Sequence, residues 1–244
     1  MEVHHHSHTP RKKWTHYFWE FFMLFLAVTL GFFVENQREH YVEHIREKQY
    51  IKLMVADLQA DTTMMNSILA TLEVRALNVD SMLMLLTNDP LSDEKIIQAY
   101  RYTYPALNTI TFSFNDRTIT QLKNSGNMRI IRNQKVNDGI IQYWNQLDNV
   151  MQALSRHISY RTKGRELETK IYNVAKMYLG NSRRIDVSSG DINLIPHTAD
   201  LVKEYANVVA SSGIMLGALR LHITNQYKLA LELIGLLVKE YHLK

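Results

Sequence analysis

The feature that most constrains this chain is an apolar segment near its start, residues 14–34, whose only acidic or basic side chain apart from a histidine is Glu20. An α-helix rises about 1.5 Å per residue, so this segment spans about 31 Å, close to the thickness of a bilayer's hydrocarbon core. A secretory signal has a shorter apolar core followed by small residues, whereas this segment ends with Phe32, Phe33 and Val34. We therefore expect an uncleaved transmembrane helix, not a signal or the core helix of a soluble protein.

The flanks of this segment predict its orientation. Aromatic and basic side chains gather at its N-terminal end: Arg11, Lys12, Lys13, Trp14, Tyr17 and Trp19. Aromatic rings favour the headgroup region, and basic residues favour the cytoplasmic side. Residues 1–13 are therefore expected to form a histidine-rich, basic cytoplasmic stub. Residues 35–244 would form an extracytoplasmic domain, which lies in the periplasm if residues 14–34 cross the inner membrane of a cell with two membranes.

Glu20 is an acidic residue inside the predicted span, and His16 precedes it by one helical turn. Intramembrane carboxylates often serve ion or proton pathways. Glu20 is also close enough to the basic flank for its carboxylate to reach the interface or to hydrogen-bond a neighbour. The pair Glu20 and His16 therefore has two interpretations, ion coupling and interfacial placement.

Composition predicts an all-α domain without covalent staples. The whole chain has four prolines, nine glycines and no cysteine, so helix breakers are few and disulfides or cysteine-ligated metals are excluded. About 210 residues after the span are enough chain for one substantial core.

A heptad pattern follows the predicted span. Counting four and three residues alternately from Ile51 to Leu86 gives eleven positions, of which only Thr62 is polar. A period of 3.5 residues predicts a long helix that packs against another helix, either of the same chain or of a second copy in a coiled coil. Residues 35–50 contain neither glycine nor proline, so we expect the transmembrane helix to continue into this one.

Capping residues locate the later helices. Ser92, Asn133 and Thr198 each precede helical patterns, and the helix after Asn133 is expected to reach as far as Leu179. Residues 229–238, LALELIGLLV, are apolar on nearly all sides and predict deep burial. The predicted architecture is one transmembrane helix continuing into a bundle of three long helices, with a cap of short helices between the first and second. Neighbours joined by short connections would be antiparallel.

Two stretches carry a resemblance to a known group. REHYVEHIREKQYIKLMVADLQADT after the single span, together with TITQLKNSGNMRIIRN, resembles a group of uncharacterised single-pass membrane proteins common in Bacteroidota. The resemblance implies a short basic N-terminus, one anchor helix and a helical extracytoplasmic domain. It implies no particular chemistry.

Metal and cofactor sites have little support. His40 and His44 lie four residues apart, which is suitable for two ligands on one helix face, but Tyr41 stands where an H-E-x-x-H motif needs glutamate. We therefore treat both histidines as weak metal candidates on a solvated face. No cofactor is expected, and the sequence contains neither a G-x-S-x-G motif nor a P-loop, so we expect a protein that is not an enzyme.

Charge is unevenly distributed along the chain. Residues 35–100 contain 11 acidic and 6 basic residues, whereas residues 101–184 contain 5 acidic and 14 basic ones. The two regions could pack against each other, or the surplus basic residues could bind an acidic partner or anionic lipid. The predicted partner-binding residues are Arg156, Arg161, Lys163, Arg165, Arg183 and Arg184.

Three functional classes remain. The first is a membrane-anchored scaffold that binds other membrane or envelope proteins, itself as a homo-oligomer, or the lipid bilayer. The second is a periplasmic ligand-sensing module, which would signal through a partner because residues 1–13 are too few for an output domain. The third is an accessory subunit of an ion-driven membrane complex, and Glu20 is the only sequence feature that supports it. Nucleic acid is not expected as a partner, because the predicted compartment excludes it.

Overall fold

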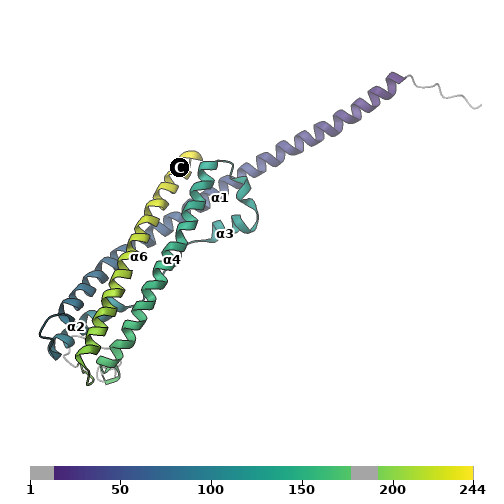
Figure 1. The fold of residues 1–244 in the computed structure, drawn as a ribbon. Helices are drawn as coiled ribbons and strands as arrows, with labels where there is room; N and C mark the ends of the chain where they lie inside the picture. Colours follow the sequence, from purple (N-terminus) through teal and green to yellow (C-terminus); the bar gives the residue numbers. More distant parts are fainter. Residues whose placement is uncertain (1–13, 177–191, 244) are drawn as a thin grey trace, which may run out of the picture. The chain divides into compact units, whose positions relative to one another are not determined.

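The computed structural model describes residues 14–176 and 192–243, and over these residues the chain is helical with no strand, so the predicted all-α class is confirmed. The chain forms three long helices, and shorter helices lie between the first and the second of them along the chain, as predicted (Figure 1). The helices are α1 (Trp14–Leu86), α2 (Asp93–Leu107), α3 (Arg117–Asn124), η1 (Asn127–Ile130), α4 (Gln134–Ile171) and α6 (Ala199–Glu240).

The chain divides into two compact units, one ending at Tyr50 and the other beginning at Ile51. The described part of the first unit is a single helical stretch, the beginning of α1. Nearly all of its large apolar side chains between residues 14 and 34 are exposed, including Trp14 at 80% and Phe32 at 78%. A helix that is apolar on all sides gains nothing from contact with water, so this stretch requires an apolar surrounding.

The second unit is a helical bundle built from residues 51–86 of α1 together with α4 and α6. Tyr143 of α4 hydrogen-bonds Asp61 of α1, and fourteen residues further along both helices (61 to 75, 143 to 157) the charge of Arg75 acts on His157. These two contacts occur in the same order along both helices, so α1 and α4 are parallel. The chain between them, residues 87–133, runs back along α1 before α4 begins. The long helix α6 is antiparallel to α4, beside which it lies (Figure 1).

Helix caps follow the sequence closely. The side chains of Ser92, Asn133 and Thr198 accept hydrogen bonds from backbone N–H groups in the first turns of α2, α4 and α6. Each cap pairs a donor that has no partner inside the helix. After α3 the chain turns at Gly126, whose φ of 67° lies in the left-handed region that glycine adopts without strain. The predictions of the three caps are confirmed.

The heptad prediction is correct in one of its two rows of residues. The row that begins at Ile51 and repeats every seven residues to Leu86 is buried throughout. The other predicted row, Val55 to Leu83, is mostly half-buried. A fully buried row lies between them and consists of Met54, Asp61, Ile68, Arg75 and Met82. A search for apolar residues at heptad spacing does not detect this row, because two of its members, Asp61 and Arg75, are charged.

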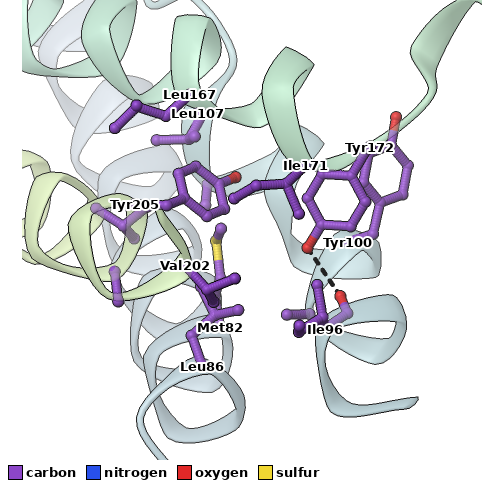
Figure 2. Close-up of a cluster of buried hydrophobic side chains, with 14 of the residues drawn as sticks. Met82, Leu86, Ile96, Tyr100, Leu107, Leu167, Ile171, Tyr172, Val202 and Tyr205 are labelled. Carbon is purple, nitrogen blue, oxygen red and sulfur yellow. Dashed lines mark hydrogen bonds between the residues drawn. The ribbon is translucent and has the colours of Figure 1, made fainter. Parts of the chain in front are cut away.

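One end of the bundle is closed by an apolar cluster with three tyrosines, shown in Figure 2. The Tyr172 ring lies 4.7 Å from that of Tyr100 and 6.4 Å from that of Tyr205, measured between centroids. The Tyr172 hydroxyl donates a 2.8 Å hydrogen bond to the carbonyl of Ile96. Side chains from α1, α2 and the end of α4 thereby meet the start of α6.

Two predictions about helices are wrong in part. The helix α4 ends at Ile171 and does not reach Leu179, because backbone bonds to Asn193 and Ile195 and the Tyr172 hydroxyl bond draw the chain out of the helix. Residues 177–179 lie outside the described part. Residues 229–238 are buried on one side only, with Leu231 47% exposed. In a bundle of three long helices each helix has two neighbours, so its outer face meets solvent.

Candidate functional site

The predicted site residues on α1 do not form a metal centre. His16 and Glu20 lie in the exposed apolar stretch of the first unit. His40 Nδ1 lies 4.0 Å from a carboxylate oxygen of Glu43, and His44 Nδ1 lies 3.5 Å from one of Glu47. Each histidine thus pairs with an acid three residues further on. No group of three or more metal-ligating side chains occurs within residues 14–176 and 192–243.

The predicted basic stretch separates into two kinds of residue. Arg156 and Lys163, seven residues apart on α4, are exposed. Arg165 is half-buried and forms a 2.7 Å ion pair with buried Glu168. Arg161 is half-buried, and its Nε atom is completely enclosed. Arg183 and Arg184 lie outside the described residues. Among the four of these residues that the structure describes, Arg156 and Lys163 face solvent, whereas Arg161 and Arg165 are partly enclosed by the bundle.

A first polar layer crosses the bundle core, and we call it the acidic layer: Asp61, Tyr143 and Gln226. Tyr143 donates a 3.0 Å hydrogen bond to Asp61, and the Gln226 amide donates a 3.1 Å bond to the backbone carbonyl of Tyr143. Asp61 also accepts from the backbone and side-chain N–H groups of Asn115 at 2.9 and 2.7 Å. Beside it is a cavity of about 10 Å³, close to the smallest that can hold one water.

A second polar layer lies two heptads away, and we call it the basic layer: Arg75, His157 and Arg161. Arg75 donates to the backbone carbonyls of Asn108 and Thr109. The Nδ1 atom of His157 lies 3.3 Å from the carbonyl oxygen of Ser212 in α6. A carbonyl can only accept, so Nδ1 carries the proton of this bond. The helices α1, α4 and α6 contribute to both layers.

An extended segment, residues 108–116, runs along α1 between the two layers. Its beginning is held by Arg75 and its end by Asp61. Fourteen residue steps of helix span about 21 Å, and the seven residue steps from Asn108 to Asn115 span about 23 Å when extended. Burial alternates along it: Ile110 is buried, and Phe112 and Phe114 are half-buried, whereas the residues between them are exposed.

The end of this segment is fixed by a second carboxylate of α1. Asp57 is buried, and one of its oxygens accepts from Thr118, whose hydroxyl and backbone N–H both donate to it. Its other oxygen forms a 3.0 Å ion pair with Arg117. A carboxylate from the acidic first region thus pairs with a guanidinium from the basic middle region, which is one of the two interpretations of the charge distribution. The pair positions the start of α3 against α1.

The enclosed position of the layers shifts the pKa values of their members. Burial raises the pKa of Asp61, an effect opposed by its bonds from Asn115 and Tyr143. Burial likewise raises the pKa of Tyr143, and the Asp61 charge adds to this. Burial lowers the pKa of His157, and the charges of Arg75 and Arg161 lower it further. At neutral pH the His157 ring is therefore neutral.

Comparisons with known proteins add nothing to this geometry. No family model, no curated protein and no solved structure matches the chain.

Sequence reasoning missed both polar layers, because Asp61 and Arg75 read as solvated charges on a helix. One signal was available. Asp61 and Arg75 stand in register with Met54, Ile68 and Met82, at intervals of seven residues. A charged residue at a regular apolar interval indicates a buried polar contact as well as an exposed face.

Proposed function

We propose that this protein is a non-enzymatic, membrane-anchored helical scaffold or interaction protein of the cell envelope. In this proposal residues 14–34 cross the inner membrane once, the N-terminus is cytoplasmic and the bundle lies in the periplasm. The resemblance to single-pass membrane proteins of Bacteroidota implies the same arrangement of one anchor helix and a helical extracytoplasmic domain.

The observation that carries this proposal is the exposed apolar start of α1. Two helices, α1 and α6, are long and apolar enough to cross a membrane by length and composition. The apolar window of α1 has no buried residue, whereas 39% of the window in α6 is buried in the bundle. An apolar face already covered by other helices needs no lipid. We therefore assign the anchor to α1 alone.

Anchoring is tested by placing a charge at the centre of the span. Arginine at the middle of a transmembrane helix costs about 2.5–3.5 kcal/mol on insertion scales. We expect Leu24→Arg to shift the full chain from the membrane pellet towards the carbonate-soluble fraction. Tyr41→Arg, on an exposed position after the span, is the matched control and should stay in the pellet. Equal behaviour of both variants would argue against the anchor.

Partner binding is tested on the exposed basic pair of α4. Arg156 and Lys163 have no hydrogen bond or ion pair within the described ranges 14–176 and 192–243, which leaves them available to an acidic surface. Reversing both to glutamate should remove a chemically cross-linked partner from the purified full chain and leave its melting temperature nearly unchanged. An unaltered set of cross-linked partners would contradict a partner surface here.

A ligand-sensing module is the second candidate, and the basic layer favours it. Enclosed polar atoms without partners are unusual in a core that serves only to hold helices together. A small molecule that raises the melting temperature of the full chain would support this alternative.

A further inference from the structure

Three positive or ionisable nitrogen groups gather in the basic layer without an acid to balance them. Arg75 is 8% exposed and His157 1%, and Arg161 is half-buried on the same face of α4 as His157. Within the described part of the chain, neither Arg75 nor Arg161 forms an ion pair. The carboxylates of the neighbouring ion pairs, Glu73 and Glu168, are engaged by Arg220 and Arg165.

Several enclosed atoms of this layer also lack hydrogen-bond partners. They are Nε of Arg161, Nε2 of His157 and the hydroxyl oxygen of Ser212. More than nine in ten buried polar groups in proteins are paired, and a cluster of exceptions commonly marks a bound water or ion. Since a buried charge without a partner is strongly unfavourable, the cluster needs a counter-ion.

The electrostatics of the layer agree with this need. Burial lowers the pKa of Arg75, and the nearby charge of Arg161 lowers it further. The charges of the two guanidinium groups thus repel each other. An anion between them would reverse this effect, because each guanidinium would then face an opposite charge.

The chemistry of the donors and acceptors indicates which anion. Guanidinium groups offer a planar fork of N–H donors that matches the oxygens of phosphate or carboxylate. The neutral His157 ring donates through Nδ1 to Ser212, so its Nε2 atom is an acceptor. An acceptor at the site favours an oxyanion that carries a proton. Monohydrogen phosphate has such a proton at neutral pH, whereas sulfate and chloride do not.

We propose that the basic layer binds a phosphate group. Arg75 and Arg161 hold its oxygens, and Nε2 of His157 selects an anion that carries a proton. Part of the Arg161 side chain reaches solvent, because this residue is only half-buried. Tyr104, which is 62% exposed, is a neighbour of Arg75 at this side of the layer. A phosphate bound there would connect α1 with α4 and the start of the extended segment.

The test is thermal unfolding of the full chain in a non-ionic detergent at pH 7. Inorganic phosphate should raise the melting temperature by several degrees over sodium chloride or sodium sulfate of equal ionic strength. Arg161→Gln should abolish this rise, and Arg156→Gln, on an exposed position five residues earlier in α4, should retain it. In sodium chloride alone, Arg161→Gln should melt at or above the parent temperature, because it removes an unpaired charge.

Three results would overturn the site. They are no stabilisation over the other salts by either inorganic phosphate or phosphatidic acid, an equal phosphate effect in Arg161→Gln, and a lower melting temperature of Arg161→Gln in every salt by the same amount. Mixed micelles containing phosphatidic acid distinguish the source of the phosphate group. Stabilisation by them but not by inorganic phosphate identifies a lipid headgroup, and the reverse identifies a free ion. Loss of all phosphate effects would leave the anchored interaction role untouched, because that role depends on α1 and the exposed pair of α4.

Discussion

At the scale of single residues, Gly213 shows how closely two helices of the bundle approach. A Cβ atom added to Gly213 of α6 would lie 2.9 Å from a methyl carbon of Val79 in α1. Val79 is 4% exposed and belongs to the closed apolar end. Gly217, four residues further along α6, has no neighbouring atom within 4 Å of the corresponding position. One glycine is thus required for packing and the other is not.

Alanine at these two positions should therefore change stability in opposite directions. Gly217→Ala should raise the free energy of unfolding by about 0.5–1 kcal/mol, because alanine is the better helix former. Gly213→Ala should lower it by about 1 kcal/mol or more, because overpacking exceeds that gain. Denaturant unfolding of the full chain in detergent measures both. The pair Gly213→Ala with Val79→Ala should recover part of the loss, and the absence of recovery would indicate another cause.

Asp61 gives a second expectation at this scale, through pH. Its folded pKa is raised above the ordinary 3.8, mainly by burial. The folded state therefore binds the proton more tightly, so Asp61 stabilises the fold fully below pH 3.8, and this stabilisation is lost as pH rises through the raised pKa. The loss is at most about 1.4 kcal/mol per pH unit. Asp61→Asn keeps the shape of the side chain and removes the titration.

The free energy of unfolding of the parent minus that of Asp61→Asn should thus fall as pH rises from about 3.8 towards neutrality. Asn66→Ala, at an exposed position of the same helix, removes no ionisable group and should give a difference that stays nearly constant. Unfolding in urea at a series of pH values measures both differences. A flat difference for Asp61→Asn would mean that this carboxylate is hydrated in the folded protein.

At the scale of helices, the order of burial along α1 can be tested by truncation. Leu72 is 0% exposed, Leu69 is half-buried and Leu77 is 58% exposed. Leu72→Ala should cost about 2–5 kcal/mol, Leu69→Ala less, and Leu77→Ala within about 0.5 kcal/mol of zero. Chemical unfolding of the three variants gives this order directly. Equal losses at Leu69 and Leu72 would indicate that the row from Val55 to Leu83 is buried as deeply as the row that begins at Ile51.

The same helix shows how far sequence reasoning reaches and where it stops. The caps at Ser92, Asn133 and Thr198 are local, since a side chain bonds to a backbone N–H two or three residues away, and they were predicted correctly. The roles of Asp61 and Arg75 depend on residues 33 to 82 positions away in the chain. No local pattern contains such contacts. The end of α4 was misplaced for the same reason, because long-range bonds around Tyr172 end it.

The candidate sites divide in a similar way. The histidines at 40 and 44 stay weak metal candidates, because their spacing alone supplies two donors where a stable metal site needs three or four. Arg161 was grouped with exposed neighbours, although its place one turn after His157 puts it against the core. Whether an arginine on an amphipathic helix faces the core depends on which rows of residues pack together in the bundle. The apolar pattern alone does not identify those rows.

At the scale of the whole molecule, the lack of cysteine allows a direct test of single-pass topology. Three single-cysteine variants of the full chain suffice: Met23→Cys within residues 14–34, Tyr41→Cys after them, and Leu221→Cys on α6. All three positions are more than half exposed in the structure. A membrane-impermeant maleimide added to sealed spheroplasts reaches only exposed thiols on the outer side.

We expect labelling at positions 41 and 221 but not at 23, where the thiol is surrounded by lipid tails. Unlabelled Leu221→Cys beside labelled Tyr41→Cys would indicate that α6 enters the membrane or is covered by a partner, and detergent with a denaturant would then serve as the labelling control. Equal labelling at 23 and 41 would place the start of α1 in water. In that case its exposed aromatic side chains would need a protein partner, because an apolar face of this size is not stable in contact with solvent.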